Sequence, residues 1–164
     1  MHDSAKLNAK RFFDKHCRYE TATVIDIGSQ DVNGSLRDVC PFNYIGVDFV
    51  AGKNVDVILD DQYKFPLDDN SAEIVVSSSC FEHSEFFWLT FLEMVRISKD
   101  LIYVCAPSTG KVHRYPVDCW RFYPDSGQAL ANWANRNGYK VELLETYTDT
   151  NKWGDWVAIF RTHK

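Results

Sequence analysis

The sequence predicts an α/β protein built on a mostly parallel sheet with helices on both faces. Five short runs of β-branched and other apolar residues occur between residues 23 and 105, and they resemble strands buried on both faces. Helical patterns are interleaved with these runs, as in α/β folds. Polar residues directly follow several of the runs, as expected where parallel strands end at a ligand-binding edge. We expect one domain over residues 1–164, with residues 1–21 as an N-terminal helical extension.

Each element follows from a local pattern. Helices are expected at residues 4–17, at residues 84–98, where apolar residues recur at helical spacing, and after Pro124 to about residue 136. Strands are expected at residues 23–27, 43–47, 55–59, 73–77, 101–105, 139–146 and 156–161. Asn137-Gly138 is a stop signal for the third helix.

The connections predict a trimmed member of this fold class. Residues 49–54 cannot hold a full crossover helix, and residues 62–72 are not expected to hold one. The last two strands are joined by residues 149–155, which predicts an antiparallel hairpin at one edge of the sheet.

Composition and charge exclude several function classes. The 164 residues are 45% hydrophobic and 25% charged, with a net charge of -5, which is ordinary for a soluble globular protein. An acidic chain argues against nucleic acid as the main partner. No apolar run approaches the roughly 20 residues that span a bilayer, and the polar N-terminal segment does not resemble a signal peptide. Five irregularly spaced cysteines without a CxxC pair indicate reduced thiols, so we expect a cytoplasmic protein.

The first candidate binding feature is the turn that follows residues 23–27. The strand ends in Gly28-Ser29, a glycine turn expected to open toward a helix and to offer free backbone N–H groups to an anionic ligand. Asp48 ends the next strand, 20 residues after Gly28, where a carboxylate can accept both hydroxyls of a ribose. Each feature alone also fits an ordinary strand end, and the combination is more specific than either part.

Two further polar groups fall on the same predicted edge. Asp60-Asp61 follows the third strand, where a carboxylate either accepts a hydrogen bond from an adenine amino group or stabilises a turn. Residues 77–83 end the fourth strand with the sequence SSSCFEH. Because open α/β sheets bind ligands at the carboxyl ends of their strands, the four features together predict one binding site.

Four possible metal ligands also fall near this edge. Cys80 and His83 have CxxH spacing, and His113 and Cys119 lie downstream. This spacing matches no usual zinc framework, so the sequence predicts no metal site.

Taken together, these residues resemble the class I methyltransferase family, which uses S-adenosylmethionine. FPLDDNSAEIVV at residues 65–76 is similar to the "LPFPDNSFDLVV" stretch of that family, and Glu82-His83 is similar to the "EH" that follows it. Residues 28–35 resemble a subgroup with "GSxDVNGS", and HRYPVDCWRFYP at residues 113–124 resembles its downstream signature. The resemblance covers about residues 22–161. It implies a Rossmann-like seven-stranded sheet of order 3-2-1-4-5-7-6, with strand 7 antiparallel.

The resemblance also implies the cofactor, S-adenosyl-L-methionine, with S-adenosyl-L-homocysteine as product. Asp26 and Gly28 would shape the methionine end of the site, and Asp48 would hold the ribose. Glu82 and His83 would lie near the sulfonium.

The remaining implied cofactor contacts are Asp61 with Gln62 at the adenine, together with Ser29 and Ser78. The sequence departs from the family where Gln30 replaces the second glycine of the usual GxGxG. A side chain there can crowd the cofactor, although the subgroup with GSxDVNGS tolerates this residue.

The candidate catalytic residues lie after the fourth and fifth strands. His113 is the favoured general base and His83 the second candidate. Asp118 and Arg121 accompany His113, and Arg121 can pair either with an acidic acceptor or with Asp118. The alternative is a structural network in which His113, Asp118 and Arg121 pin the loop.

The predicted function is methyl transfer to a small-molecule or glycan acceptor. One alternative is a non-catalytic partner subunit that binds S-adenosylmethionine, suggested by the missing glycine and the short N-terminal region. A nicotinamide-dinucleotide enzyme is disfavoured because no GxGxxG is completed. Residues 86–92 cover more than one helical stripe, so they form either a core face or an interface, including one between two copies of the chain.

Overall fold

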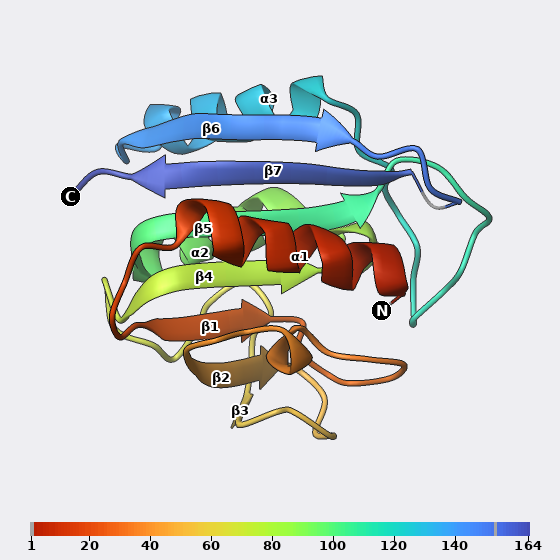
Figure 1. Ribbon diagram of the computed structural model, residues 1–164, viewed down its shortest axis with the longest axis horizontal. Coiled ribbons are helices and arrows are strands. Elements are labelled where there is room, and N and C mark those ends of the chain that lie inside the picture. The colour runs from red at the N-terminus through yellow and green to blue at the C-terminus, as the bar shows by residue number, and fades with distance from the viewer. Residues whose placement is uncertain (1, 153) are drawn as a thin grey trace.

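The computed structural model describes residues 2–152 and 154–164. It contains a seven-stranded sheet of order β3-β2-β1-β4-β5-β7-β6 (Figure 1). The strands are β1 Thr23–Ile27, β2 Asn43–Asp48, β3 Val57–Ile58, β4 Ala72–Ser78, β5 Ser98–Pro107, β6 Val141–Thr148 and β7 Asp155–Thr162. Strands β3, β2, β1, β4 and β5 each run parallel to their neighbours in this order, and β7 pairs antiparallel with both β5 and β6. The predicted strand order and edge hairpin are confirmed.

Helices cover both faces of the sheet, as predicted. Helix α1 (Asp3–His16) crosses one face, and α2 (Phe87–Ile97) and α3 (Asp125–Arg136) pack on the other (Figure 1). The two faces carry separate apolar clusters, because successive side chains of a strand point to opposite sides. On the α1 face, Phe12 stacks on Tyr103 with ring centroids 4.9 Å apart. None of the described helices is long and apolar enough to cross a membrane.

The crossovers are trimmed, and the glycine turn does not open toward a helix as expected. The β1–β2 connection contains only a 3₁₀ turn, η1 (Leu36–Asp38). The Asp31 carboxylate accepts the Gly34 N–H at 2.6 Å, and the Ser35 hydroxyl accepts the Arg37 N–H at 3.1 Å. Such local side-chain bonds to the backbone compete with helix formation, so the segment closes as turns.

Some boundaries also differ from the predicted ones. Strand β3 is two residues long, because as an edge strand it pairs only where Val57 and Ile58 lie beside the end of β2. The helix expected at residues 84–98 begins at Phe87, since the preceding residues form the 3₁₀ turn η2 (Phe81–His83). Ser98 already belongs to β5.

Candidate functional site

A cavity of about 690 Å³ opens at the carboxyl ends of β1, β2 and β4. The glycine loop after β1, the end of β2 and the segment after β4 line it. The chain leaves β1 for β2 on one side of the sheet and later returns to β4 on the other, which is the usual position of a ligand crevice in open α/β sheets. The volume lies within the range of about 300–1,000 Å³ that holds small molecules and cofactors.

Gly28 lies where no other residue fits. Its φ is +82°, and a Cβ there would stand 2.6 Å from both Cβ and Sγ of Cys80. The N–H groups of Gly28 and Ser29 both donate to the Val47 carbonyl, at 2.9 and 3.2 Å. These N–H groups are therefore not free for an anionic ligand as expected, because the loop closes onto β2. The glycine instead lets the backbone line the cavity closely.

Asp48 lies at the cavity edge and is tightly held. Its carboxylate accepts backbone N–H groups from Gln30 at 3.0 Å, Phe49 at 2.8 Å and Val50 at 3.3 Å. The side chain is buried. A carboxylate has about four acceptor positions, so these bonds fix its orientation and leave capacity for a ligand donor.

Gln30 replaces the usual glycine, and Gly52 leaves space for its side chain. A Cβ on Gly52 would stand 2.7 Å from the Gln30 Nε2, so the Gln30 side chain rests against that glycine. Gln62 lines the cavity, as the adenine role requires. Asp61 is exposed and accepts the Tyr63 N–H at 2.8 Å, and it is not among the described residues that line the cavity.

Asp26 and Ser78 place polar atoms in the cavity wall. The Tyr44 hydroxyl donates to the buried Asp26 carboxylate. Burial raises the pKa of Asp26 to about 7, although the bond from Tyr44 lowers it in part. The other Asp26 oxygen and the Ser78 hydroxyl have no hydrogen-bond partner among the described residues. Buried polar atoms of this kind are rare unless a ligand or water completes them.

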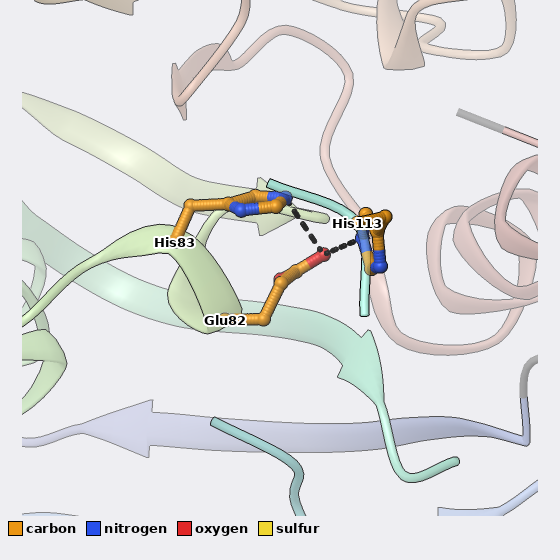
Figure 2. Close-up of side chains that lie close together, drawn as sticks. All are labelled: Glu82, His83 and His113. Atoms are coloured by element: carbon orange, nitrogen blue, oxygen red, sulfur yellow. Dashed lines mark ion pairs between the residues drawn. The ribbon is translucent and has the colours of Figure 1, made fainter. Parts of the chain in front are cut away.

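Glu82, His83 and His113 meet at the side of the cavity toward β5 (Figure 2). Glu82 and His83 belong to η2, and His113 comes from the loop after β5. The Nε2 atoms of His83 and His113 lie 3.6 and 3.7 Å from Oε1 of Glu82. The Glu82 carboxylate raises the pKa of His113 above its ordinary value. Carboxylate and imidazoles thus face one point in the cavity.

Asp118 and Arg121 form a network within the loop. Two Arg121 nitrogens donate to the two Asp118 oxygens at 2.5 and 2.8 Å, and Arg121 also donates to the Lys111 carbonyl at 3.1 Å. The Arg121 guanidinium holds the pKa of the Asp118 carboxyl well below its usual range. The Asp118 carboxylate also accepts a hydrogen bond from the backbone N–H of His113 at 2.7 Å. These contacts support the loop-pinning alternative for Asp118 and Arg121, while the His113 ring remains at the cavity.

Sequence reasoning missed several residues that shape the site. Tyr44 bonds to Asp26 from the neighbouring strand, and Gly52 makes room for Gln30. His2 lines the cavity and bonds to Asp155 at 2.9 Å. Tyr44 could be found only from the strand register, because it lies on β2 two residues before Gly46, which pairs with Asp26. Nothing local in the sequence signals His2.

No protein-family model and no curated protein matches the sequence. Solved structures do match. The Burkholderia thailandensis 1,6-didemethyltoxoflavin-N1-methyltransferase, solved with bound 1,6-didemethyltoxoflavin and S-adenosylhomocysteine, has a TM-score of 0.71 and 11% identity over 99% of this chain and 80% of that chain. A chain in the complex between the Haloferax volcanii Trm112 methyltransferase activator and a methyltransferase has a TM-score of 0.63 and 16% identity, over 99% and 96% of the two chains.

A SAM-dependent methyltransferase from Aquifex aeolicus has a TM-score of 0.60 and 14% identity, over 94% of this chain and 88% of that chain. At these identities the likeness concerns the fold, and it agrees with the sheet order and the antiparallel β7. The chain therefore has the Rossmann-like fold that these methyltransferases share.

Proposed function

We propose that this protein binds S-adenosylmethionine and transfers its methyl group to a small-molecule or glycan acceptor. The observation that carries the proposal is the cavity at the carboxyl ends of β1, β2 and β4, in which Gly28, Asp48 and Glu82 line successive parts. The shared fold with methyltransferases supports the choice of cofactor.

The proposed division of the cavity follows from its polar groups. The remaining acceptor position of Asp48 holds a ribose hydroxyl, Gln62 lies toward the adenine, and Asp26 and Gly28 border the methionine part. The sulfonium then faces the part of the cavity lined by Glu82.

Chemistry at that end needs little from the protein, because the cofactor carries the reactive methyl group. The protein aligns the acceptor for in-line displacement and removes its proton where needed. His113 is partly exposed at the cavity, so an acceptor can reach its ring, and His83 is the second candidate base. We infer that Asp118 and Arg121 hold the loop that carries His113.

The structure gives one reason to disfavour a dinucleotide. Such cofactors place their pyrophosphate against free N–H groups of a glycine-rich turn at a helix N-terminus. Here the N–H groups of Gly28 and Ser29 donate to the Val47 carbonyl, and the described residues between β1 and β2 contain only the 3₁₀ turn η1 and no α-helix. A non-catalytic subunit that binds S-adenosylmethionine is the second candidate. The contacts by which Arg121 holds the loop would suit an enzyme and a binding subunit equally well.

Ligand-dependent thermal unfolding tests the proposal. S-adenosylhomocysteine well above its Kd should raise the Tm, whereas NAD should not. A Tm rise with NAD alone would contradict the proposed cofactor. A methyl-transfer assay with labelled S-adenosylmethionine and a library of small molecules and glycans then separates an enzyme from a binding subunit.

A further inference from the structure

Three side chains in the cavity are arranged as ligands around one point. The Nε2 atoms of His83 and His113 lie 3.6 and 3.7 Å from Oε1 of Glu82, and the three ligand atoms lie within 4.8 Å of one another (Figure 2). These separations are longer than hydrogen bonds. They are close to the roughly 3.4 Å that separates tetrahedral ligands held about 2.0–2.2 Å from a zinc ion.

The other nitrogen of each imidazole has a backbone acceptor. Nδ1 of His83 lies 2.5 Å from the Val117 carbonyl oxygen, and Nδ1 of His113 lies 3.2 Å from the Lys111 carbonyl oxygen. A carbonyl only accepts, so each Nδ1 carries the proton and each Nε2 of a neutral ring presents a lone pair. Asp118 also lies 3.4 Å from Nδ1 of His113. Metal-binding histidines are oriented by such outer hydrogen bonds to carbonyls and carboxylates.

Glu82 supplies a second, independent observation. Its side chain is 1% exposed, and its Oε2 atom has no hydrogen-bond partner among the residues that the structure describes. A buried carboxylate without compensation is costly. Two imidazole lone pairs directed at the same carboxylate add repulsion unless a cation lies between them. A proton on one ring is the competing source of compensation, and the experiment below separates it from a metal ion.

We propose that Glu82, His83 and His113 bind one divalent transition-metal ion, for which Zn²⁺ is the best match. Two imidazole nitrogens and one carboxylate form a known set for zinc ions that keep an open coordination position. All three residues line the cavity, so a ligand in the cavity could reach an ion that they hold. The candidate metal set in the sequence already contained His83 and His113, but it combined them with Cys80 and Cys119 and did not include Glu82.

The metal site would add a role in acceptor binding to the proposed function, and this role rests on the proposed function. At the acceptor end of the cavity, the ion would bind an acceptor oxygen and lower the pKa of its hydroxyl. His113 would then orient the acceptor through the metal and would not act as the base.

Metal titration of the full chain, first freed of metal with a chelator, tests the site directly. Calorimetry with Zn²⁺ should give one equivalent, and Co²⁺ should give a visible absorption band without a thiolate charge-transfer band. Glu82→Gln and His113→Gln should each weaken Zn²⁺ binding by about 100-fold or more. Glu82→Gln keeps the side-chain shape, and His113→Gln changes a partly exposed residue, so folding is checked by Tm.

Two control variants make the result specific. His163→Gln removes the histidine of an exposed histidine–glutamate pair 3.4 Å apart, and Cys119→Ser removes the exposed thiol nearest the site in sequence. Both should keep the wild-type affinity. Absence of binding at millimolar Zn²⁺, or unchanged binding in folded Glu82→Gln and His113→Gln, would overturn the site and favour a protonated imidazole.

The same samples separate this inference from the proposed function. S-adenosylhomocysteine is titrated into metal-free protein. Binding of S-adenosylhomocysteine without Zn²⁺ binding refutes the metal site and leaves the cofactor proposal standing. Binding of Zn²⁺ together with a failure to bind S-adenosylhomocysteine refutes the cofactor proposal and leaves the metal site standing.

Discussion

The two ends of the cavity differ in how their charged groups are satisfied. At the β2 end, the Asp48 carboxylate accepts N–H groups from Gln30, Phe49 and Val50, and the glycine loop is bonded to β2. At the β5 end, Glu82 is also buried, but one of its oxygens has no partner among the described residues.

This difference indicates that the two ends of the cavity have different functions. Backbone bonds fix the β2 end before any ligand arrives, which suits recognition of a constant cofactor, since a preorganised site loses little entropy on binding. The oxygen without a partner at the β5 end can instead accept a bond from a proton, an acceptor or a metal ion. We therefore expect changes at the β2 end to affect affinity and changes at the β5 end to affect turnover.

The largest effect should follow His113→Ala. Methyl transfer should fall by about 10²- to 10⁴-fold if the ring is a general base. Cofactor affinity should stay within about threefold, because the ring lies outside the proposed contacts of the adenosine. Steady-state kinetics and cofactor titration on the same folded variant measure both. His163→Ala serves as the matched control.

Other outcomes for His113→Ala sharpen the comparison. A smaller loss that appears mainly in KM would indicate that His113 orients the acceptor. Full turnover would remove it from the mechanism and leave His83 as the next candidate. A joint collapse of Tm and cofactor binding would support the loop-pinning role.

Asp48→Ala should have the next largest effect. Loss of the ribose contacts should weaken S-adenosylhomocysteine binding by on the order of 10- to 100-fold, or about 1.5–3 kcal/mol. The Tm should also fall, because three backbone N–H groups lose their acceptor. Calorimetry on the folded variant is the check, and unchanged affinity would place the ribose elsewhere.

Asp26→Asn should alter the pH dependence of stability. Burial raises the pKa of Asp26 to about 7, against a value near 3.8 in the unfolded chain. The folded state therefore retains a proton that the unfolded chain releases, so this contribution is complete below about pH 4 and is lost as the pH rises to 7. The neutral Asn removes that loss.

Urea unfolding at pH 6 and pH 8 measures the effect. Relative to the wild type, Asp26→Asn should gain about 1–2 kcal/mol of unfolding free energy between the two pH values, since each pKa unit corresponds to about 1.4 kcal/mol. Parallel pH profiles of the two proteins would show that Asp26 is ionised in the folded state. Glu142→Gln, an exposed change, is the control for surface charge.

The smallest effect is expected at Asp61. Its carboxylate is exposed and caps the turn at Tyr63, so Asp61→Ala should change S-adenosylhomocysteine affinity by less than about threefold. Gln62→Ala, which removes a side chain lining the cavity, should weaken binding more. The reverse ranking in calorimetry would restore the adenine contact to Asp61.

Much of the fold could be predicted because its determinants are local. The β-branched run 23–27 matches β1 residue for residue, and Asn137-Gly138 ends α3 as expected. The missing crossover helices follow from connection length. The strand order came from the family resemblance, since periodicity alone does not say which strands pair.

The site could be predicted only in part, because its chemistry depends on contacts across the sheet. The strand-end rule placed Gly28, Asp48 and Glu82 at one edge. It did not show that the Gly28 N–H is occupied by Val47. The approach of His113 to Glu82 joins segments about 30 residues apart and depends on the path of a loop, which no local pattern encodes.

A crystal structure with S-adenosylhomocysteine bound tests the central claim most directly. The account predicts the ligand in the cavity at the carboxyl ends of β1, β2 and β4, with a ribose hydroxyl on Asp48 and the sulfur directed toward Glu82 and His113. A ligand bound outside this cavity, or one whose sulfur points away from Glu82, would contradict the account.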